Sequence, residues 1–90
     1  MQLEVRLFGA FRNLSPEPLI QVTLLGESCS ILELKAAIGE VLLKSEKNAE
    51  FDVRELLSKT AIADESQILE DSAILRSGMR VAVLPPVNGG

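Results

Sequence analysis

The chain opens on a regular alternation of polar and apolar residues. From Gln2 to Leu7 the odd positions carry apolar side chains and the even positions carry polar or charged ones. Successive side chains of a strand point to opposite faces, so this segment is predicted to be a strand with Leu3, Val5 and Leu7 facing a core. Phe8 falls on the outward side of this alternation.

A second alternation runs from Leu19 to Leu25, with Ile20, Val22 and Leu24 on one face and Gly26 at its end. It predicts a strand that pairs with the first as a hairpin. The connection over residues 9–18 contains Gly, Asn, Ser and two Pro, and is expected to be a loop.

The strongest helical signal begins at Ser30. Ser30 and Glu33 have the spacing of a capping box, and Cys29 and Leu34 have the spacing of a hydrophobic staple around it. Cys29 is therefore interpreted as an apolar packing residue rather than a reactive thiol. Gly39 lies inside the helix and costs about 1 kcal/mol relative to Ala, which is tolerable if the helix lies close on a sheet. The apolar stripe of the helix is Ile31, Leu34, Ile38, Val41 and Leu42.

The second half of the chain is predicted as shorter elements. They are a helix from Phe51 to Leu57 with Leu56 and Leu57 buried, a strand from Lys59 to Ala63, a turn at Asp64–Ser66, a strand from Gln67 to Glu70, a turn from Asp71 to Gly78 with Ile74 and Leu75 inward, and a last strand from Met79 to Leu84.

The order of these elements predicts an α+β fold. A ββαββ chain with one long helix packed on one face of a mixed sheet, and with the first and last strands parallel at its centre, is the ubiquitin-like β-grasp. We divide the chain into a β-grasp domain, residues 1–84, and an extended tail, residues 85–90. Phe8, Ile68 and Leu84 then share the uncovered face of the sheet, which predicts a docking patch for a partner.

The composition of the chain argues against several kinds of ligand and activity. The chain has 90 residues, a net charge of −4, no histidine and a single cysteine. An acidic chain without a basic cluster is not expected to bind nucleic acid or an anionic membrane. One cysteine and no histidine argue against a disulfide, a metal site or self-contained catalysis. No segment is long enough to span a bilayer, and we expect a cytoplasmic protein that binds no cofactor itself.

The tail combines two residue types with opposite mechanical properties. Pro85 and Pro86 lack a backbone N–H and favour a stiff, extended chain. Gly89 and Gly90 have no side chain, so the end of the chain can enter a slot too narrow for a Cβ. Residue types alone leave open whether this tail is a frayed end or a functional arm.

The segment from Leu75 to Gly90 resembles the end of the MoaD family, the sulfur-carrier subunit of molybdopterin synthase. The resemblance rests on a turn glycine, Gly78, followed by a strand with Val81 and Ala82 and by Pro-Pro-Val-Asn-Gly-Gly. Val5-Arg6-Leu7-Phe8-Gly9-Ala10 is also similar to the family's first strand. The chain departs from the family pattern in having Met79 and Arg80 where an acidic pair is common, and Asp64 and Glu65 where neutral residues are.

The resemblance implies that an ATP-dependent, MoeB-like enzyme adenylates the carboxylate of Gly90. A desulfurase system then supplies sulfur to form a thiocarboxylate. The tail enters a MoaE-like large subunit, where the sulfur builds the molybdopterin dithiolene, and two small and two large subunits form a heterotetramer. The tail residues are Pro85, Pro86, Val87, Asn88, Gly89 and Gly90, and Phe8, Ile68 and Leu84 match the family's apolar contacts with the large subunit.

Several alternatives remain open from the sequence. The chain could carry sulfur for thiamine synthesis or tRNA thiolation, although the thiamine carrier is shorter and lacks the double proline. It could be a protein modifier whose Gly90 forms isopeptide bonds with lysines. It could also be a non-catalytic interaction domain with an idle tail.

Overall fold

The computed structural model describes residues 1–84. Its helices and strands are bounded as follows: β1 Gln2–Leu7, a 3₁₀-helix Gly9–Asn13, β2 Leu19–Thr23, β3 Ser28–Ser30, α1 Ile31–Leu42, α2 Glu50–Ser58, β4 Ala61–Ala63, β5 Ile74–Arg76 and β6 Arg80–Leu84.

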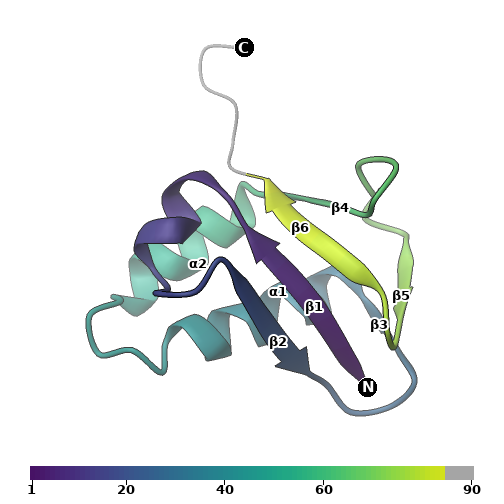
Figure 1. Ribbon diagram of the computed structural model, residues 1–90, viewed down its shortest axis with the longest axis horizontal. Coiled ribbons are helices and arrows are strands. Elements are labelled where there is room, and N and C mark those ends of the chain that lie inside the picture. Colours follow the sequence, from purple (N-terminus) through teal and green to yellow (C-terminus); the bar gives the residue numbers. More distant parts are fainter. Residues whose placement is uncertain (85–90) are drawn as a thin grey trace.

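The main sheet has four strands in the order β2-β1-β6-β4. β1 and β2 form the predicted antiparallel hairpin, and β1 lies parallel to β6 with Val5 opposite Val81. The prediction that the first and last strands are parallel neighbours at the centre of the sheet is confirmed. Figure 1 shows both helices behind this sheet, so one face of the sheet is covered and the other is open.

The core lies between the main sheet and the helices. The side chains of Leu3, Val5 and Leu7 are buried, as the alternation of β1 predicts. The packing is mostly aliphatic and consists of Leu3, Val5, Leu7, Phe11, Val22, Cys29, Ile31, Leu34, Ile38, Leu42, Val53, Leu57, Ile62, Leu75, Val81 and Val83. No helix within residues 1–84 is long and apolar enough to cross a membrane.

The predicted capping box fixes the start of α1. The Ser30 hydroxyl accepts a hydrogen bond from the backbone N–H of Glu33 at 3.1 Å, and the Glu33 carboxylate accepts one from the N–H of Ser30 at 2.9 Å. Both N–H groups would otherwise lack a partner at the helix start. Cys29 and Leu34 are both buried beside the cap, at the two staple positions.

Replacing Ser30 with alanine is expected to lower the free energy of unfolding by about 1 kcal/mol, because the N–H of Glu33 loses its acceptor. Chemical denaturation of both proteins measures this difference. Ser72→Ala is the matched control, since Ser72 is exposed in a turn and no side-chain hydrogen bond involves it within residues 1–84. An equal effect of both substitutions would contradict the role of the cap.

The structure differs from the prediction in the burial of Leu56 and in the neighbour of Gly39. α2 buries Val53 and Leu57, four residues apart, whereas the predicted Leu56 is only half-buried. Gly39 does lie at a close approach, but to α2 rather than to the sheet, because a Cβ at Gly39 would be 3.3 Å from Cδ1 of Leu57. The glycine therefore allows the two helices to pack side by side.

The prediction for residues 67–78 is wrong in two places. Residues 67–70 form no strand, and Ile68 makes only an isolated bridge to Ala63. Ile74 is 57% exposed rather than inward, because it lies in β5 beside Leu75 and neighbouring strand residues face opposite sides. β5 pairs with the unpredicted strand β3, and Cys29 lies opposite Leu75 in this second, two-stranded sheet.

The predicted loop over residues 9–18 contains an unpredicted 3₁₀-helix, Gly9–Asn13. Its Phe11 is completely buried, and Gly9 adopts a φ of 58°, which favours glycine. The glycine allows the chain to bend from β1 into this short helix. The connection between β1 and β2 therefore supplies a side chain to the core.

Candidate functional site

The open face of the main sheet brings Phe8 and Leu84 together. Leu7 lies opposite Val83, and the next residues of the two segments are Phe8, which is still in an extended conformation, and Leu84. Phe8 and Leu84 therefore follow side by side in the register of β1 and β6. Both point away from the helices, because Leu7 and Val83 are buried and neighbouring residues alternate. Phe8 is 41% exposed, and Leu84 is half-buried.

Ile68 reaches the same face by a different route. The carboxylate of Asp64 accepts hydrogen bonds from the backbone N–H groups of Ser66 and Gln67, each at 2.8 Å, and folds the chain back after β4. This turn places Ile68 opposite Ala63, which is itself opposite Ala82 of β6. Residues directly opposite each other share a face, so the side chain of Ile68, 63% exposed, lies on the open face.

The sequence prediction missed part of this surface. Arg6 of β1 lies between Leu19 of β2 and Ala82 of β6, and all three face outward. Leu19 is exposed and extends the apolar surface across β1 to the edge of the sheet. The register between the hairpin strands would have identified Leu19, since the prediction already placed Ile20 inward. We call Phe8, Leu19, Ile68, Ala82 and Leu84 the apolar patch.

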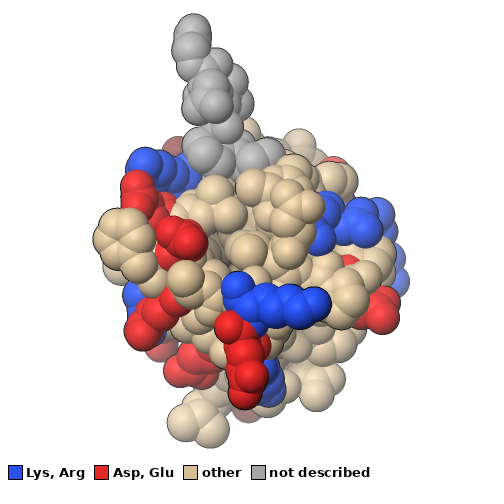
Figure 2. Space-filling view, turned by 90° about the vertical axis from the view of Figure 1, so that its left-hand side faces the viewer, with Lys and Arg blue, Asp and Glu red and all other residues tan. Residues whose placement is uncertain are grey.

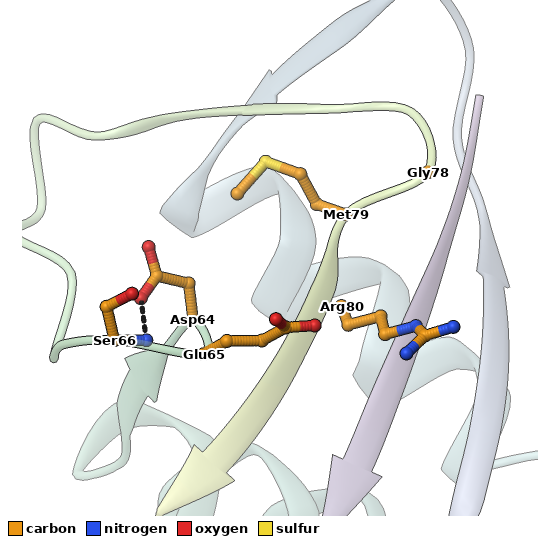
Figure 3. A pocket seen from close by; sticks show the side chains of 6 residues that line it. All are labelled: Asp64, Glu65, Ser66, Gly78, Met79 and Arg80. Carbon is orange, nitrogen blue, oxygen red and sulfur yellow. Dashed lines mark hydrogen bonds between the residues drawn. The ribbon is translucent and has the colours of Figure 1, made fainter.

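The open face becomes charged toward the other end of β6. Nε of Arg80 lies 3.7 Å from a carboxylate oxygen of Glu4 on β1. A hollow of about 510 Å³ lies beside this pair and is lined by Asp64, Glu65, Ser66, Gly78, Met79 and Arg80. Figure 3 shows the carboxylate of Glu65 extending across β6 toward Arg80. A smaller hollow of about 270 Å³ joins this charged end to Phe8, Arg6 and Ala82.

Three solved structures share this fold over nearly the whole chain. Two are of small archaeal modifier protein 1 from Haloferax volcanii. The first has a TM-score of 0.68 and 20% sequence identity, and the match covers 100% of both chains. The second has a TM-score of 0.64 and 19% identity, and the match covers 96% of this chain and 98% of that one. The third is a complex of subunits 1 and 2 of the molybdopterin-converting factor from Helicobacter pylori, with a TM-score of 0.58, 27% identity and 100% coverage of both chains. No family model and no curated protein matches the sequence.

The chain has a MoaD-like β-grasp fold. This ubiquitin-like fold is common to the archaeal modifier and to the molybdopterin-converting factor complex. The α+β class and the ubiquitin-like architecture predicted from the element order are confirmed.

Met79 and Arg80, which depart from the MoaD pattern, have separate roles in this β-grasp. Met79 is half-buried against the core, and its sulfur accepts a hydrogen bond from the backbone N–H of Arg76 at 3.2 Å. Arg80 faces outward and pairs with Glu4. Met79 therefore contributes to packing, whereas Arg80 contributes to the charge of the open face.

Charges of both signs are mixed on the side of this MoaD-like protein that carries the 3₁₀-helix. Figure 2 shows the side at the left of Figure 1, where the 3₁₀-helix and the connection between α1 and α2 lie. Acidic and basic side chains alternate there, and they surround an uncharged area. Among the described residues on this side, Lys and Arg form no extended basic surface of the kind that phosphate backbones require.

Within residues 1–84, no three Cys, Asp or Glu side chains form a group that could hold a metal ion. Cys29 is buried, and this burial raises the pKa of its thiol, as does the nearby Glu33 carboxylate. A raised pKa keeps the thiol protonated near neutral pH and so reduces its nucleophilicity. The interpretation of Cys29 as a packing residue agrees with this position.

The remaining predicted site residues, Pro85, Pro86, Val87, Asn88, Gly89 and Gly90, lie outside the described residues. They follow Leu84, which is the last described residue. Leu84 ends β6 beside Phe8 and opposite Ala61 of β4. In this MoaD-like fold, the apolar patch therefore adjoins the base of the tail.

Proposed function

We propose that this protein is the sulfur carrier of a molybdopterin synthase. The observation that carries the proposal is the apolar patch at the base of a Pro-Pro-Val-Asn-Gly-Gly tail. The molybdopterin-converting factor subunit, which is 27% identical over the full length of both chains, supports this assignment. The domain then serves chiefly to present the tail to partner proteins.

The proposed reactive group is the carboxylate of Gly90, which requires that the mature chain ends there. A carboxylate resists substitution because the oxygen it would lose is a poor leaving group. An ATP-dependent, MoeB-like enzyme overcomes this by adenylation, and sulfur then displaces AMP from the carbonyl carbon to leave a thiocarboxylate. The thiocarboxylate sulfur attacks the pyranopterin precursor within the large subunit, and two carriers are consumed for each dithiolene.

The tail residues serve access rather than chemistry in this proposal. Gly89 and Gly90 carry no side chain, so the chain can enter narrow active sites in both partner enzymes. Pro85 and Pro86 favour an extended chain, which holds the reactive end away from the domain. No cofactor bound to the carrier is needed, because ATP acts at the activating enzyme.

The proposed partner for the apolar patch is a MoaE-like large subunit. The related Helicobacter pylori structure is itself a complex of two subunits. Phe8, Leu19 and Ile68 are exposed apolar side chains, and covering them would remove apolar surface from water. We extend the proposal to a heterotetramer of two small and two large subunits in the cytoplasm.

Intact mass spectrometry tests the carrier function directly. The protein ending at Gly90 is incubated with ATP, a MoeB-like enzyme and a sulfur donor, and its mass is expected to rise by the exchange of one oxygen for one sulfur. A chain lacking Gly89 and Gly90 is the control and is expected to keep its mass. An unchanged mass of the full chain, with an enzyme that thiolates another carrier in parallel, would contradict the proposal.

The thiolated protein is then incubated with its large subunit and a pyranopterin precursor. Conversion of the precursor would distinguish molybdopterin synthesis from thiamine synthesis or tRNA thiolation. The two archaeal modifier structures favour one further candidate, a protein modifier. That function would produce larger covalent adducts on target lysines rather than sulfur transfer. An interaction domain with an idle tail would bind its partner equally well without Gly89 and Gly90.

A further inference from the structure

Arg6 lies on the open face where the apolar patch meets the charged end of the sheet. Its neighbours across the sheet are Leu19 and Ala82, and its outward neighbours along β1 are Glu4 and Phe8. The Arg6 side chain is exposed, and it lines the hollow of about 270 Å³. The other lining residues are Phe8, Val81 and Ala82 and the charged residues Glu4, Asp64, Glu65 and Arg80. Any protein that covers the apolar patch must therefore also cover Arg6.

Among residues 1–84, no acidic side chain forms an ion pair with Arg6. Glu4 is instead paired with Arg80 at 3.7 Å. The carboxylate of Asp64 accepts hydrogen bonds from two backbone N–H groups in its own turn. Figure 3 shows the carboxylate of Glu65 extending toward Arg80. Glu4 and Asp64 thus have other partners within the domain.

Covering an unpaired guanidinium is costly, because its charge and its N–H donors lose water. A carboxylate on the covering protein can replace that water with two parallel hydrogen bonds to the planar guanidinium. An aromatic ring would attract the charge but would leave the N–H donors without acceptors. The acceptor best suited to Arg6 is therefore a carboxylate.

We propose that the partner protein that docks on the apolar patch places an Asp or Glu carboxylate against Arg6. This inference rests on the proposed function and specifies the large subunit by its chemistry: an apolar docking surface with one carboxylate set within it. Arg6 then determines which partner is accepted, since a surface without this carboxylate leaves a buried charge unpaired.

Arg6→Met tests this inference against simple burial. The dissociation constant for the MoaE-like large subunit of the same organism is measured by titration calorimetry. Met removes the charge but keeps an unbranched apolar side chain, and the unpaired carboxylate on the partner is expected to weaken binding about 30-fold or more. Binding of the Arg6→Met protein is also expected to depend less on salt concentration than that of the wild type.

Arg54→Met is the matched control. Arg54 is an exposed arginine of α2, on the side of the sheet away from the patch, and it pairs with Glu50 in the same helix. Its replacement is expected to leave the dissociation constant unchanged, whereas Arg6→Lys, which keeps the charge but not the planar geometry, is expected to weaken binding less than Arg6→Met.

Binding of the wild type and of Arg6→Met together tests both the inference and the proposed function. If the wild type binds and Arg6→Met binds equally well or more tightly, the partner offers no carboxylate and the inference is overturned, while the proposed function stands. If the wild type does not bind the large subunit, the proposed function fails and the inference fails with it. Weaker binding by Arg6→Met alone, with a reduced salt dependence, supports both.

Discussion

Replacing Phe11 with alanine is expected to lower the free energy of unfolding by about 3–5 kcal/mol. Phe11 is completely buried, and it is the only phenylalanine among the core residues within positions 1–84. Truncation at Cβ removes the whole ring from this packing and leaves a cavity that the surrounding aliphatic side chains fill only in part. A small domain has a total stability of about 5–15 kcal/mol, so this loss is a large fraction of it.

Urea denaturation of the wild type and of Phe11→Ala measures this loss. Phe51→Ala is the matched control, because the same ring is 75% exposed on α2 and its removal leaves no internal cavity. Its stability is expected to stay within about 0.5 kcal/mol of the wild type. Equal stability of Phe11→Ala and Phe51→Ala would show that the 3₁₀-helix does not contribute to the core.

Replacing Phe8 with aspartate is expected to weaken binding of the large subunit about 100-fold or more. Phe8 lies at the centre of the proposed contact, beside Leu84 and at the base of the tail. The substitution removes an apolar ring and introduces a carboxylate that would be buried without a partner. Leu84→Asp is expected to act in the same direction, because Leu84 is its neighbour on the same face.

Titration calorimetry with the large subunit measures the change, and circular dichroism verifies that each variant is folded. Phe51→Asp introduces the same charge on an exposed phenylalanine of α2 and is expected to bind normally. Loss of binding by Phe51→Asp, with normal binding by Phe8→Asp, would place the interface on the helices. Unfolding of Phe8→Asp would show that the ring belongs to the core.

Local sequence patterns were sufficient for the elements that depend on neighbouring residues. The alternation in β1 identified its buried residues, and the spacing of Ser30 and Glu33 identified the start of α1. Both rest on contacts within a few residues, so the chain encodes them locally. The shared face of Phe8 and Leu84 also followed from alternation, once β1 and β6 were taken as parallel neighbours.

The sequence predictions were wrong or incomplete where a residue's environment depends on a segment far away in the sequence. β3 is only Ser28–Ser30, and it is a strand because β5 lies beside it, so its own residues carry no alternation long enough to detect. Gly39 was interpreted as tolerable in a helix that lies close on a sheet, but its close neighbour is Leu57 of α2, which depends on how the two helices pack. Leu19 joined the apolar patch only through its register with Arg6.

The sequence by itself determined the β-grasp order, the cap of α1, the inward face of β1 and the residue types of the tail. Each of these follows from side-chain spacing, from the capping hydroxyl of Ser30 or from the backbone chemistry of Pro and Gly. Only the tertiary structure decided that Phe11 enters the core and that Arg6 lies between Leu19 and Ala82 without an acidic partner among residues 1–84. These two features depend on which strands lie side by side and in which register, and register is set by long-range packing.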